Sequence, residues 1–225
     1  MKPGSCTLPL PGIEPVLLDE KSGAELTTAS AKGVLALKRA WPGLARSIYG
    51  DHGRFKDVYM GAYKGYYFTG DGAYRDEDGY YWIVGRVDDV LNVAGHRLGT
   101  AELEAAFVQH AAAAEAAVVG VPHAVKGTAI VAFVVLKDGF PFSNDIATEL
   151  RAAVRTHVSP IATPEAVYLV HALPKTRSGK IMRRLLRKLA TGERRASELG
   201  DTSTLSDPAV LDELIKVIDA NPVKI

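Results

Sequence analysis

The apolar runs AAVVGVP (residues 116–122) and TAIVAFVVLKD (residues 128–138) decide the fold of the C-terminal part of this chain. Both runs are short and rich in β-branched residues, and residues common in turns bound them. This pattern is typical of buried strands, and it predicts two of them here. Directly before the first run, Gly99 or Thr100 can cap a helix that carries Leu103 on its apolar face.

The segments after these strands continue the alternation of helix and strand. Residues 143–158 have apolar side chains at four-residue spacing, and Ser143 or Asn144 can cap the helix that this spacing predicts. The remaining elements are a strand at 166–174, an amphipathic helix at 181–190 and a last helix starting at Asp207-Pro208. The order α-β-β-α-β-α predicts a compact α+β unit, with a short sheet flanked by helices.

The chain before residue 88 has a different character. Short apolar runs at 15–19 and 33–40 predict strands, and the aromatic-rich stretch 66–86 predicts two or three more around an Asp78-Gly79 turn. Helical periodicity is scarce there. We therefore expect a β-rich part over residues 1–87 and a separate domain over residues 88–225, joined at the seam RVDDVLNVAG.

Composition excludes several classes of function. The formal net charge of +1 indicates neither nucleic acid nor an anionic membrane as a general partner. Cys6 is the only cysteine, so an internal disulfide is impossible and a cysteine-based zinc site is not expected. A single cysteine fits a reducing compartment, and we expect the cytoplasm. The first residues lack the apolar core of a signal peptide, and the longest apolar stretch is too short to span a bilayer.

Two stretches near the seam carry residue types suited to a ligand. Asp71 stands between glycines in TGDG, where a carboxylate can accept two hydrogen bonds from a ribose diol, although these residues taken alone favour a plain turn. Arg86 and Asp88 lie where the β-rich part gives way to the α+β unit, and this position suits either a hinge or an ordinary linker. Further on, Gly95 allows close approach of a ligand, and Arg97 suits phosphate or a purine ring.

A third stretch, LPKTRSGKIMRR (residues 173–184), is strongly basic. Its lysine at position 180 ends a glycine-containing loop, which we expect to be flexible and able to deliver a point charge to an anion. The arginines that follow, Arg183, Arg184 and Arg187, are expected to form a solvated basic face together with Lys188. Aromatic residues do not interleave with these charges, which disfavours a nucleic-acid site, and the chain has no Walker A motif.

Together these stretches resemble the AMP-forming acetyl-CoA synthetases of the adenylate-forming superfamily. The similarity follows residues 67–104, 116–127 and 173–190 in order and spacing, and it extends to the segments 2–15 and 200–208. The resemblance implies a β-rich end of a large N-terminal adenylation domain over 1–87. It also implies a mobile C-terminal domain over 88–225, ending in a C-terminal tail.

The resemblance further implies a ligation in two steps, with ATP (bound with Mg²⁺), acetate and CoA as substrates. Acetate and ATP give acetyl-adenylate and pyrophosphate, and CoA then displaces AMP to give acetyl-CoA. It assigns Asp71 to the nucleotide ribose, Arg86 to the nucleotide and Arg97 to the ATP phosphates of the first step. Asp88 is implied to be the hinge about which the domain turns between the steps.

The remaining roles implied by the resemblance lie in the C-terminal domain. Gly95 lines the pantetheine tunnel, Arg155 contacts the CoA nucleotide, and Lys180 is the catalytic lysine of adenylation. Ala94 stands where many members of the family have serine, so one hydrogen bond towards CoA is expected to be absent. Lys180 is also implied to be a site of regulatory acetylation, with a protein acetyltransferase and a deacetylase as partners.

The phosphate loop, the adenine-binding motif and the acyl pocket of this family do not occur in the sequence. We therefore expect a piece of a longer enzyme that is inactive by itself. A non-enzymatic folded remnant or interaction module, and a piece of a propionyl-CoA synthetase, remain alternatives. The acyl specificity and the oligomeric state cannot be inferred from these residues.

Overall fold

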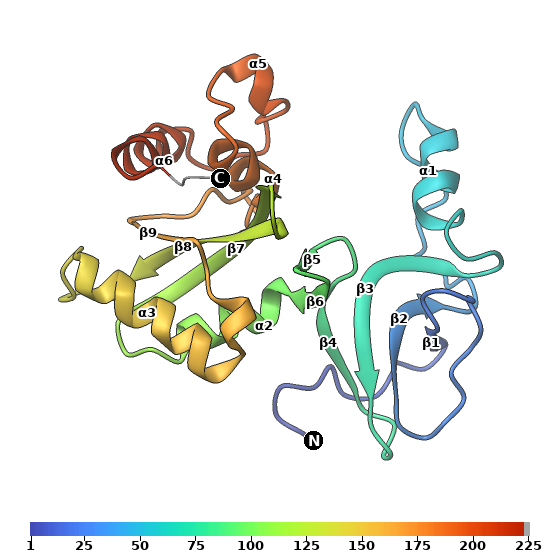
Figure 1. Cartoon of the computed structure of the whole chain (residues 1–225). Helices are drawn as coiled ribbons and strands as arrows, with labels where there is room; N and C mark the ends of the chain where they lie inside the picture. Colours follow the sequence, from blue (N-terminus) through green and yellow to red (C-terminus); the bar gives the residue numbers. More distant parts are fainter. Residues whose placement is uncertain (223–225) are drawn as a thin grey trace. The chain divides into compact units, whose positions relative to one another are not determined.

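The computed structural model describes residues 1–222, so the last three residues of the expected tail lie outside the described part. The chain divides into two compact units, Met1–Asp88 and Asp89–Ile225. Each unit is described by itself, and Figure 1 shows the elements of both.

The first unit is built on one antiparallel sheet with the strand order β1-β2-β3-β4. Its strands are β1 (Pro15–Leu18), β2 (Ala31–Leu37), β3 (Tyr67–Arg75) and β4 (Tyr81–Arg86). These are the strands that the apolar and aromatic runs predict, and Asp78-Gly79 lies in the connection between β3 and β4 as expected. The sheet has a small core on each face, one around Leu17, Ala73 and Tyr81 and the other around Leu18, Val34 and Ala36.

The scarcity of helical periodicity in this unit hid one helix, α1 (His52–Tyr59). The Asp51 side chain caps it by accepting a hydrogen bond from the Arg54 N–H at 2.9 Å. Phe55 is its buried residue, and the Tyr59 ring stacks on Tyr67 of β3 with 5.2 Å between ring centroids. Aromatic contacts with the sheet therefore stabilise a helix that has a weak apolar stripe of its own.

The second unit contains a three-stranded sheet and a separate hairpin. The sheet has the order β7-β8-β9, with β7 antiparallel and β9 parallel to β8. The strands are β5 (Val90–Val93), β6 (His96–Gly99), β7 (Ala113–His123), β8 (Gly127–Leu136) and β9 (Ala166–Val170). The helices are α2 (Thr100–Val108), α3 (Asn144–His157), η1 (Pro160–Ala162), α4 (Arg183–Ala190), α5 (Ala196–Leu199) and α6 (Ala209–Ala220).

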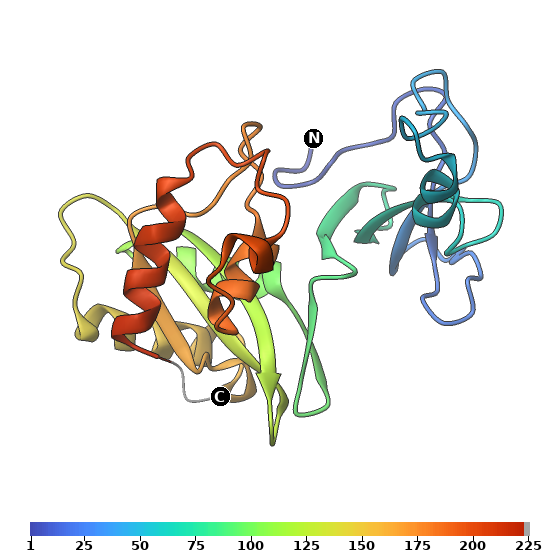
Figure 2. The same ribbon diagram turned by 90° about the horizontal axis from the view of Figure 1, so that it is seen from above.

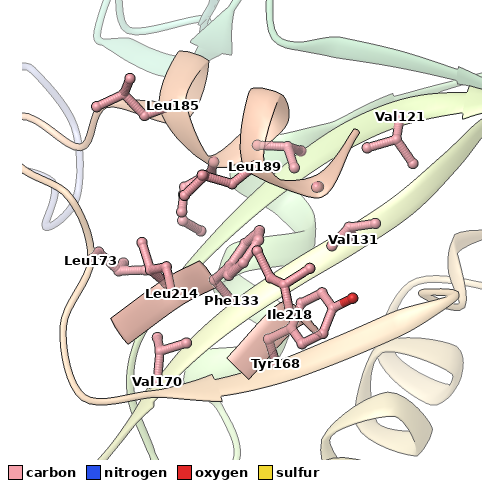
Figure 3. Close-up of a cluster of buried hydrophobic side chains, with 14 of the residues drawn as sticks. Val121, Val131, Phe133, Tyr168, Val170, Leu173, Leu185, Leu189, Leu214 and Ile218 are labelled. Carbon is pink, nitrogen blue, oxygen red and sulfur yellow. The ribbon is translucent and has the colours of Figure 1, made fainter. Parts of the chain in front are cut away.

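Helices cover both faces of this sheet, as Figures 1 and 2 show. Because strand side chains alternate between faces, Val119 and Phe133 point towards α4 and α6, whereas Val118 and Ala132 point towards α2 and α3. In Figure 3 the Phe133 ring lies among Leu189, Leu214 and Tyr168, and it stacks on Tyr168 at 5.3 Å. Both faces are thus closed, which explains why β7 and β8 are almost continuously apolar.

The expected α+β architecture of this unit is confirmed, and several of its details follow the local signals. The Ser143 side chain caps α3 by accepting from the Ile146 N–H at 3.3 Å, and Gly99 precedes α2. The last helix begins at Ala209, whose N–H is bonded to the Asp207 carboxylate at 3.0 Å. No strand was predicted at the seam, but part of it forms the hairpin β5–β6. Within residues 1–222, every helix is too short or too polar to cross a bilayer.

Candidate functional site

The first unit brings Asp71 and Arg86 together. The two residues lie directly opposite each other on β3 and β4, and Arg86 Nη1 is 3.5 Å from Asp71 Oδ1. Arg86 also donates to the Thr69 carbonyl at 3.0 Å and, through Nε, to Asp88 Oδ1 at 3.0 Å. The residues Thr69 to Asp71 lie within β3 and form no separate turn. Because Asp88 is the last residue of this unit, the guanidinium joins this part of β3 to the end of the unit. All three side chains remain partly accessible to a ligand.

Gly70 makes this arrangement possible. Its φ of +81° lies in the left-handed region, and a Cβ at this position would stand 2.6 Å from both terminal nitrogens of Arg86. Glycine is therefore favoured for two reasons: its backbone adopts this conformation without strain, and it leaves room for the guanidinium where this lies.

We predict that Gly70→Ala destabilises the first unit more than Gly65→Ala. Gly65 has a similar φ of +88°, but a Cβ there would meet nothing within 4 Å. Gly65→Ala is expected to cost the left-handed strain alone, about 1–2 kcal/mol, whereas Gly70→Ala must also displace Arg86. Guanidinium unfolding followed by tryptophan fluorescence measures both variants, because Trp41 and Trp82 lie in this unit. Equal losses in the two variants would contradict the required contact.

The second unit places Ala94, Gly95 and Arg97 on the β5–β6 hairpin. Ala94 and Gly95 form its two-residue turn and have φ values of +48° and +84°, as a type I′ turn requires. The Ala94 N–H donates to the Lys126 carbonyl at 3.0 Å, which holds the tip of the hairpin against the β7–β8 connection. The backbone at Ala94 and Gly95 is exposed, and a Cβ at Gly95 would meet nothing within 4 Å. Open space beside Gly95 is compatible with the passage of a ligand chain.

Lys180 ends a tight turn rather than a free loop. The Thr176 N–H donates to the Lys180 carbonyl at 2.8 Å, and the Lys180 N–H donates to Thr176 Oγ1 at 3.1 Å. Gly179 supplies the positive φ, +83°, that closes the turn. The expectation of a flexible loop is therefore corrected, because hydrogen bonds from Thr176 hold the backbone on both sides of Lys180.

The Lys180 side chain itself is exposed. Among the residues that the structure describes, none forms a hydrogen bond or an ion pair with its ammonium group. By contrast, the neighbouring cation Lys175 is paired with Glu115 at 2.8 Å. A fixed backbone thus presents an uncompensated positive charge, which is the chemistry needed to meet an anion.

The expectation of a solvated face of arginines is wrong for Arg183. Arg183 is half-buried and forms a bidentate pair with Glu104, with N–O distances of 2.7, 2.9 and 3.0 Å. Arg184 and Arg187 are exposed as expected. Arg184 also donates to the backbone carbonyls of Leu199 and Asp201, so it ties α4 to the end of α5 and the segment after it.

The same correction applies to Lys188. Its ammonium group donates to the Glu198 carbonyl and lies 3.1 Å from Glu193 Oε2. Arg183 and Lys188 therefore hold α4 in place, whereas Arg184 and Arg187 remain on the surface.

The elements carrying the predicted residues of this unit lie on different faces of the sheet. The Lys180 turn leads into α4 on one face, whereas Leu91 and Val93 anchor the hairpin in the core of the other face. Arg155 is exposed on α3, on the same face as the hairpin core. Within residues 1–222 we find no group of three His, Cys, Asp or Glu residues that could hold a metal ion.

Comparison with known proteins shows which families have sequences similar to the segments that carry these residues. Residues 102–180 match the family described as the AMP-binding enzyme C-terminal domain. The match includes Arg155 and ends at Lys180, while Asp71, Arg86 and the hairpin turn lie before it.

Curated relatives extend the similarity to nearly the whole chain. An acetyl-coenzyme A synthetase of Penicillium chrysogenum is 56% identical over 217 residues, which are 96% of this chain and 32% of that protein. One from Alkalilimnicola ehrlichii is 58% identical over 216 residues, 96% of this chain and 33% of that protein. The predicted resemblance to acetyl-CoA synthetases is thereby confirmed. The chain spans about a third of the length of these relatives.

Solved structures share the fold. Acetoacetyl-CoA synthetase from Streptomyces lividans superposes with a TM-score of 0.79 at 23% identity, covering 96% of this chain and 32% of that one. ATP-bound MatB from Rhodopseudomonas palustris has a TM-score of 0.73 at 25% identity, covering 84% and 36%. The chain therefore has the architecture of the corresponding part of these enzymes.

Proposed function

We propose that this chain is the C-terminal portion of an AMP-forming acetate–CoA ligase. The enzyme would join acetate to ATP as acetyl-adenylate, release pyrophosphate, and then transfer the acetyl group to CoA. The observation that carries the proposal is Lys180, an exposed ammonium without a partner among the described residues, held on a hydrogen-bonded turn. The names of the curated relatives support acetate as the acid.

The first step needs positive charge at a defined place. When the carboxylate oxygen attacks the α-phosphorus, negative charge gathers on the phosphoryl oxygens and on the departing pyrophosphate. Lys180 would stabilise this charge, and a contact of this kind is worth roughly 3–4 kcal/mol in the transition state. Asp71 and Arg86 would hold the nucleotide, with Arg97 near the phosphates. Mg²⁺ would arrive with ATP as part of the substrate, and its ligands would come mostly from outside this segment.

In the second step, Lys180 would have to move away from the acetyl-adenylate, and a channel for the CoA thiol would have to take its place. Rotation about Asp88 would exchange the Lys180 turn for the Ala94–Gly95 turn, because these segments belong to opposite faces of the sheet. Gly95 would then line the pantetheine path, and Arg155 would contact the CoA nucleotide. Acetylation of Lys180 by a protein acetyltransferase, reversed by a deacetylase, would switch off the first step by removing its charge. The single cysteine supports a reducing compartment, and we assign the protein to the cytoplasm.

Acetate-dependent exchange of label between pyrophosphate and ATP tests this proposal. The enzyme that contains this chain should exchange with acetate better than with propionate, and residues 1–225 alone should not exchange, because the phosphate loop does not occur in them. Preference for propionate would favour a propionyl-CoA synthetase. Turnover by residues 1–225 alone would show that the missing loop is not required. Failure of the whole enzyme with both acids would favour an interaction module instead.

A further inference from the structure

Two ion pairs flank the Lys180 turn along the chain. On the side before the turn, Lys175 Nζ lies 2.8 Å from Glu115 of β7. On the side after it, Arg183 at the start of α4 is bonded through two nitrogens to Glu104 of α2. A backbone bridge between Lys175 and Ile181 brings the two sides of the turn together. The lysine thus closes a short loop that is anchored at both ends.

The two anchors differ in burial. The side chains of Lys175 and Glu115 are 36% and 35% exposed, whereas those of Arg183 and Glu104 are 24% and 14% exposed. An exposed pair contributes little because solvent screens it, while a bidentate pair with less solvent contact is both stronger and more directional. The Arg183 anchor is therefore expected to dominate.

Glu104 also accepts a hydrogen bond from the backbone at the edge of the sheet. Its Oε1 accepts the N–H of Val118 at 2.9 Å, in addition to the bonds from Arg183. Strand β7 is an outer strand, paired on one side with β8, so this carboxylate satisfies a backbone donor on its open side. One side chain therefore joins α2, the edge of β7 and the beginning of α4, which belong to opposite faces of the sheet.

Nearby acids favour the charged form of Arg183. Burial by itself would lower the pKa of Arg183, but the hydrogen bonds and charge of Glu104 raise it, with a further contribution from Asp89. Asp89 is the first residue of the second unit. The guanidinium consequently interacts with acids from both the start of the unit and α2.

We propose that Glu104 and Arg183 are positioning residues for Lys180. Their ion pair sets the start of α4 against α2 and β7, and the Lys180 turn, three residues earlier in the chain, takes its position from that start. This inference rests on the proposed function in one respect, namely that Lys180 acts in adenylation. The geometrical part, which concerns the turn itself, can be tested without any activity.

Amide hydrogen exchange on the full chain tests the geometry. Glu104→Gln keeps an acceptor for the Val118 N–H but removes the charge that pairs with Arg183. We expect Glu104→Gln and Arg183→Met to speed exchange at Thr176, Lys180 and Met182 by at least tenfold, with part of the protection restored in Arg183→Lys. Glu115→Gln should change it by less than about threefold, since the Lys175 pair is exposed. Unchanged exchange in both Glu104→Gln and Arg183→Met would overturn the proposal.

Lys188→Met serves as the matched control. Lys188 is another partly buried cation of α4, but its partners are Glu193 and the Glu198 carbonyl, towards α5. Its removal should leave exchange at the turn unchanged. If Lys188→Met speeds exchange at the turn as much as Arg183→Met, the effect is general loosening of α4, and the specific role of Arg183 is refuted.

The two half-reactions of the whole enzyme test the consequence for catalysis. Because a displacement of about 1 Å can cost roughly 100-fold in rate, Glu104→Gln should slow acetate-dependent pyrophosphate exchange by tenfold or more. Thioester formation from supplied acetyl-adenylate should change by less than threefold, since Lys180 is not needed there. Parallel losses in both half-reactions would indicate a merely structural role. Normal exchange in Lys180→Ala would refute the proposed function instead, and the hydrogen-exchange result would still decide the anchor.

Discussion

Lys180→Ala in the proposed ligase that contains this chain is expected to slow acetate-dependent pyrophosphate exchange by roughly 10²–10³-fold, the usual cost of deleting one contact to developing charge. Thioester formation from supplied acetyl-adenylate should stay within a few-fold of the parent rate. The reason is that the ammonium group is exposed and has no partner among residues 1–222, so its removal leaves no buried charge behind. Rapid-quench measurement of each half-reaction checks both numbers.

Arg177→Ala is the matched control for this prediction. Arg177 is an exposed cation in the same turn, and the bond that fixes it, from its N–H to the Thr204 carbonyl at 3.1 Å, is made by the backbone and survives the substitution. Its loss should change either half-reaction by less than threefold. Lys180→Gln, which imitates the uncharged acetylated lysine, should behave like Lys180→Ala. If Arg177→Ala is as slow as Lys180→Ala, the turn acts by its total charge, and the special role of Lys180 is wrong.

Phe133→Ala is expected to lower the unfolding free energy of the second unit by about 3–5 kcal/mol. Phe133 is fully buried on β8, and the α4 and α6 helices close over it (Figure 3). Truncation would leave a cavity among Leu189, Leu214 and Tyr168, and Tyr168 would lose its stacking partner. Phe140→Ala is the control, because Phe140 is 38% exposed and its loss should cost no more than about 0.5 kcal/mol.

The tryptophans help to assign this effect to the right unit. Trp41 and Trp82 both lie in the first unit, so fluorescence follows its unfolding, while far-UV circular dichroism also follows the helices of the second. Denaturant titration of Phe133→Ala should shift the dichroism transition. A loss below about 1 kcal/mol would mean that the site collapses around the missing ring, contrary to the dense packing that the core indicates. Matching shifts in fluorescence would show that the two units unfold together.

Most of the secondary structure was predictable from local patterns, each of them contained within a short segment of the chain. Strands β7 and β8 were predictable because both faces are buried, which demands continuous apolar residues. Helix α3 was predictable because a capping serine and an apolar stripe agree. Helix α1 was missed because its stability depends on aromatic rings of β3, and the β5–β6 hairpin was missed because its turn uses Ala94 rather than a typical glycine or asparagine.

Some residues of the candidate site were likewise predictable from local motifs, and others were not. Lys180, Asp71 and Gly95 could be singled out because each stands in a local motif with glycine beside it or at its position. Glu104 could not, since its partner Arg183 lies 79 positions further along the chain and no local pattern links them. For the same reason, the sequence predicted Arg183 as a surface charge, whereas its contact with this distant residue half-buries it.

By itself, then, the sequence determined the order of most strands and helices, the resemblance to the acetyl-CoA synthetases and the choice of Lys180 as the candidate lysine. These depend on properties of short segments, such as side-chain period, capping and turn chemistry, which a chain carries before it folds. Only the tertiary structure decided that Lys180 ends a hydrogen-bonded turn and that Arg183 is half-buried against Glu104. The physical reason is that burial and ion pairing are properties of distant segments brought together, and their strength depends on how much water is removed at the place where they meet.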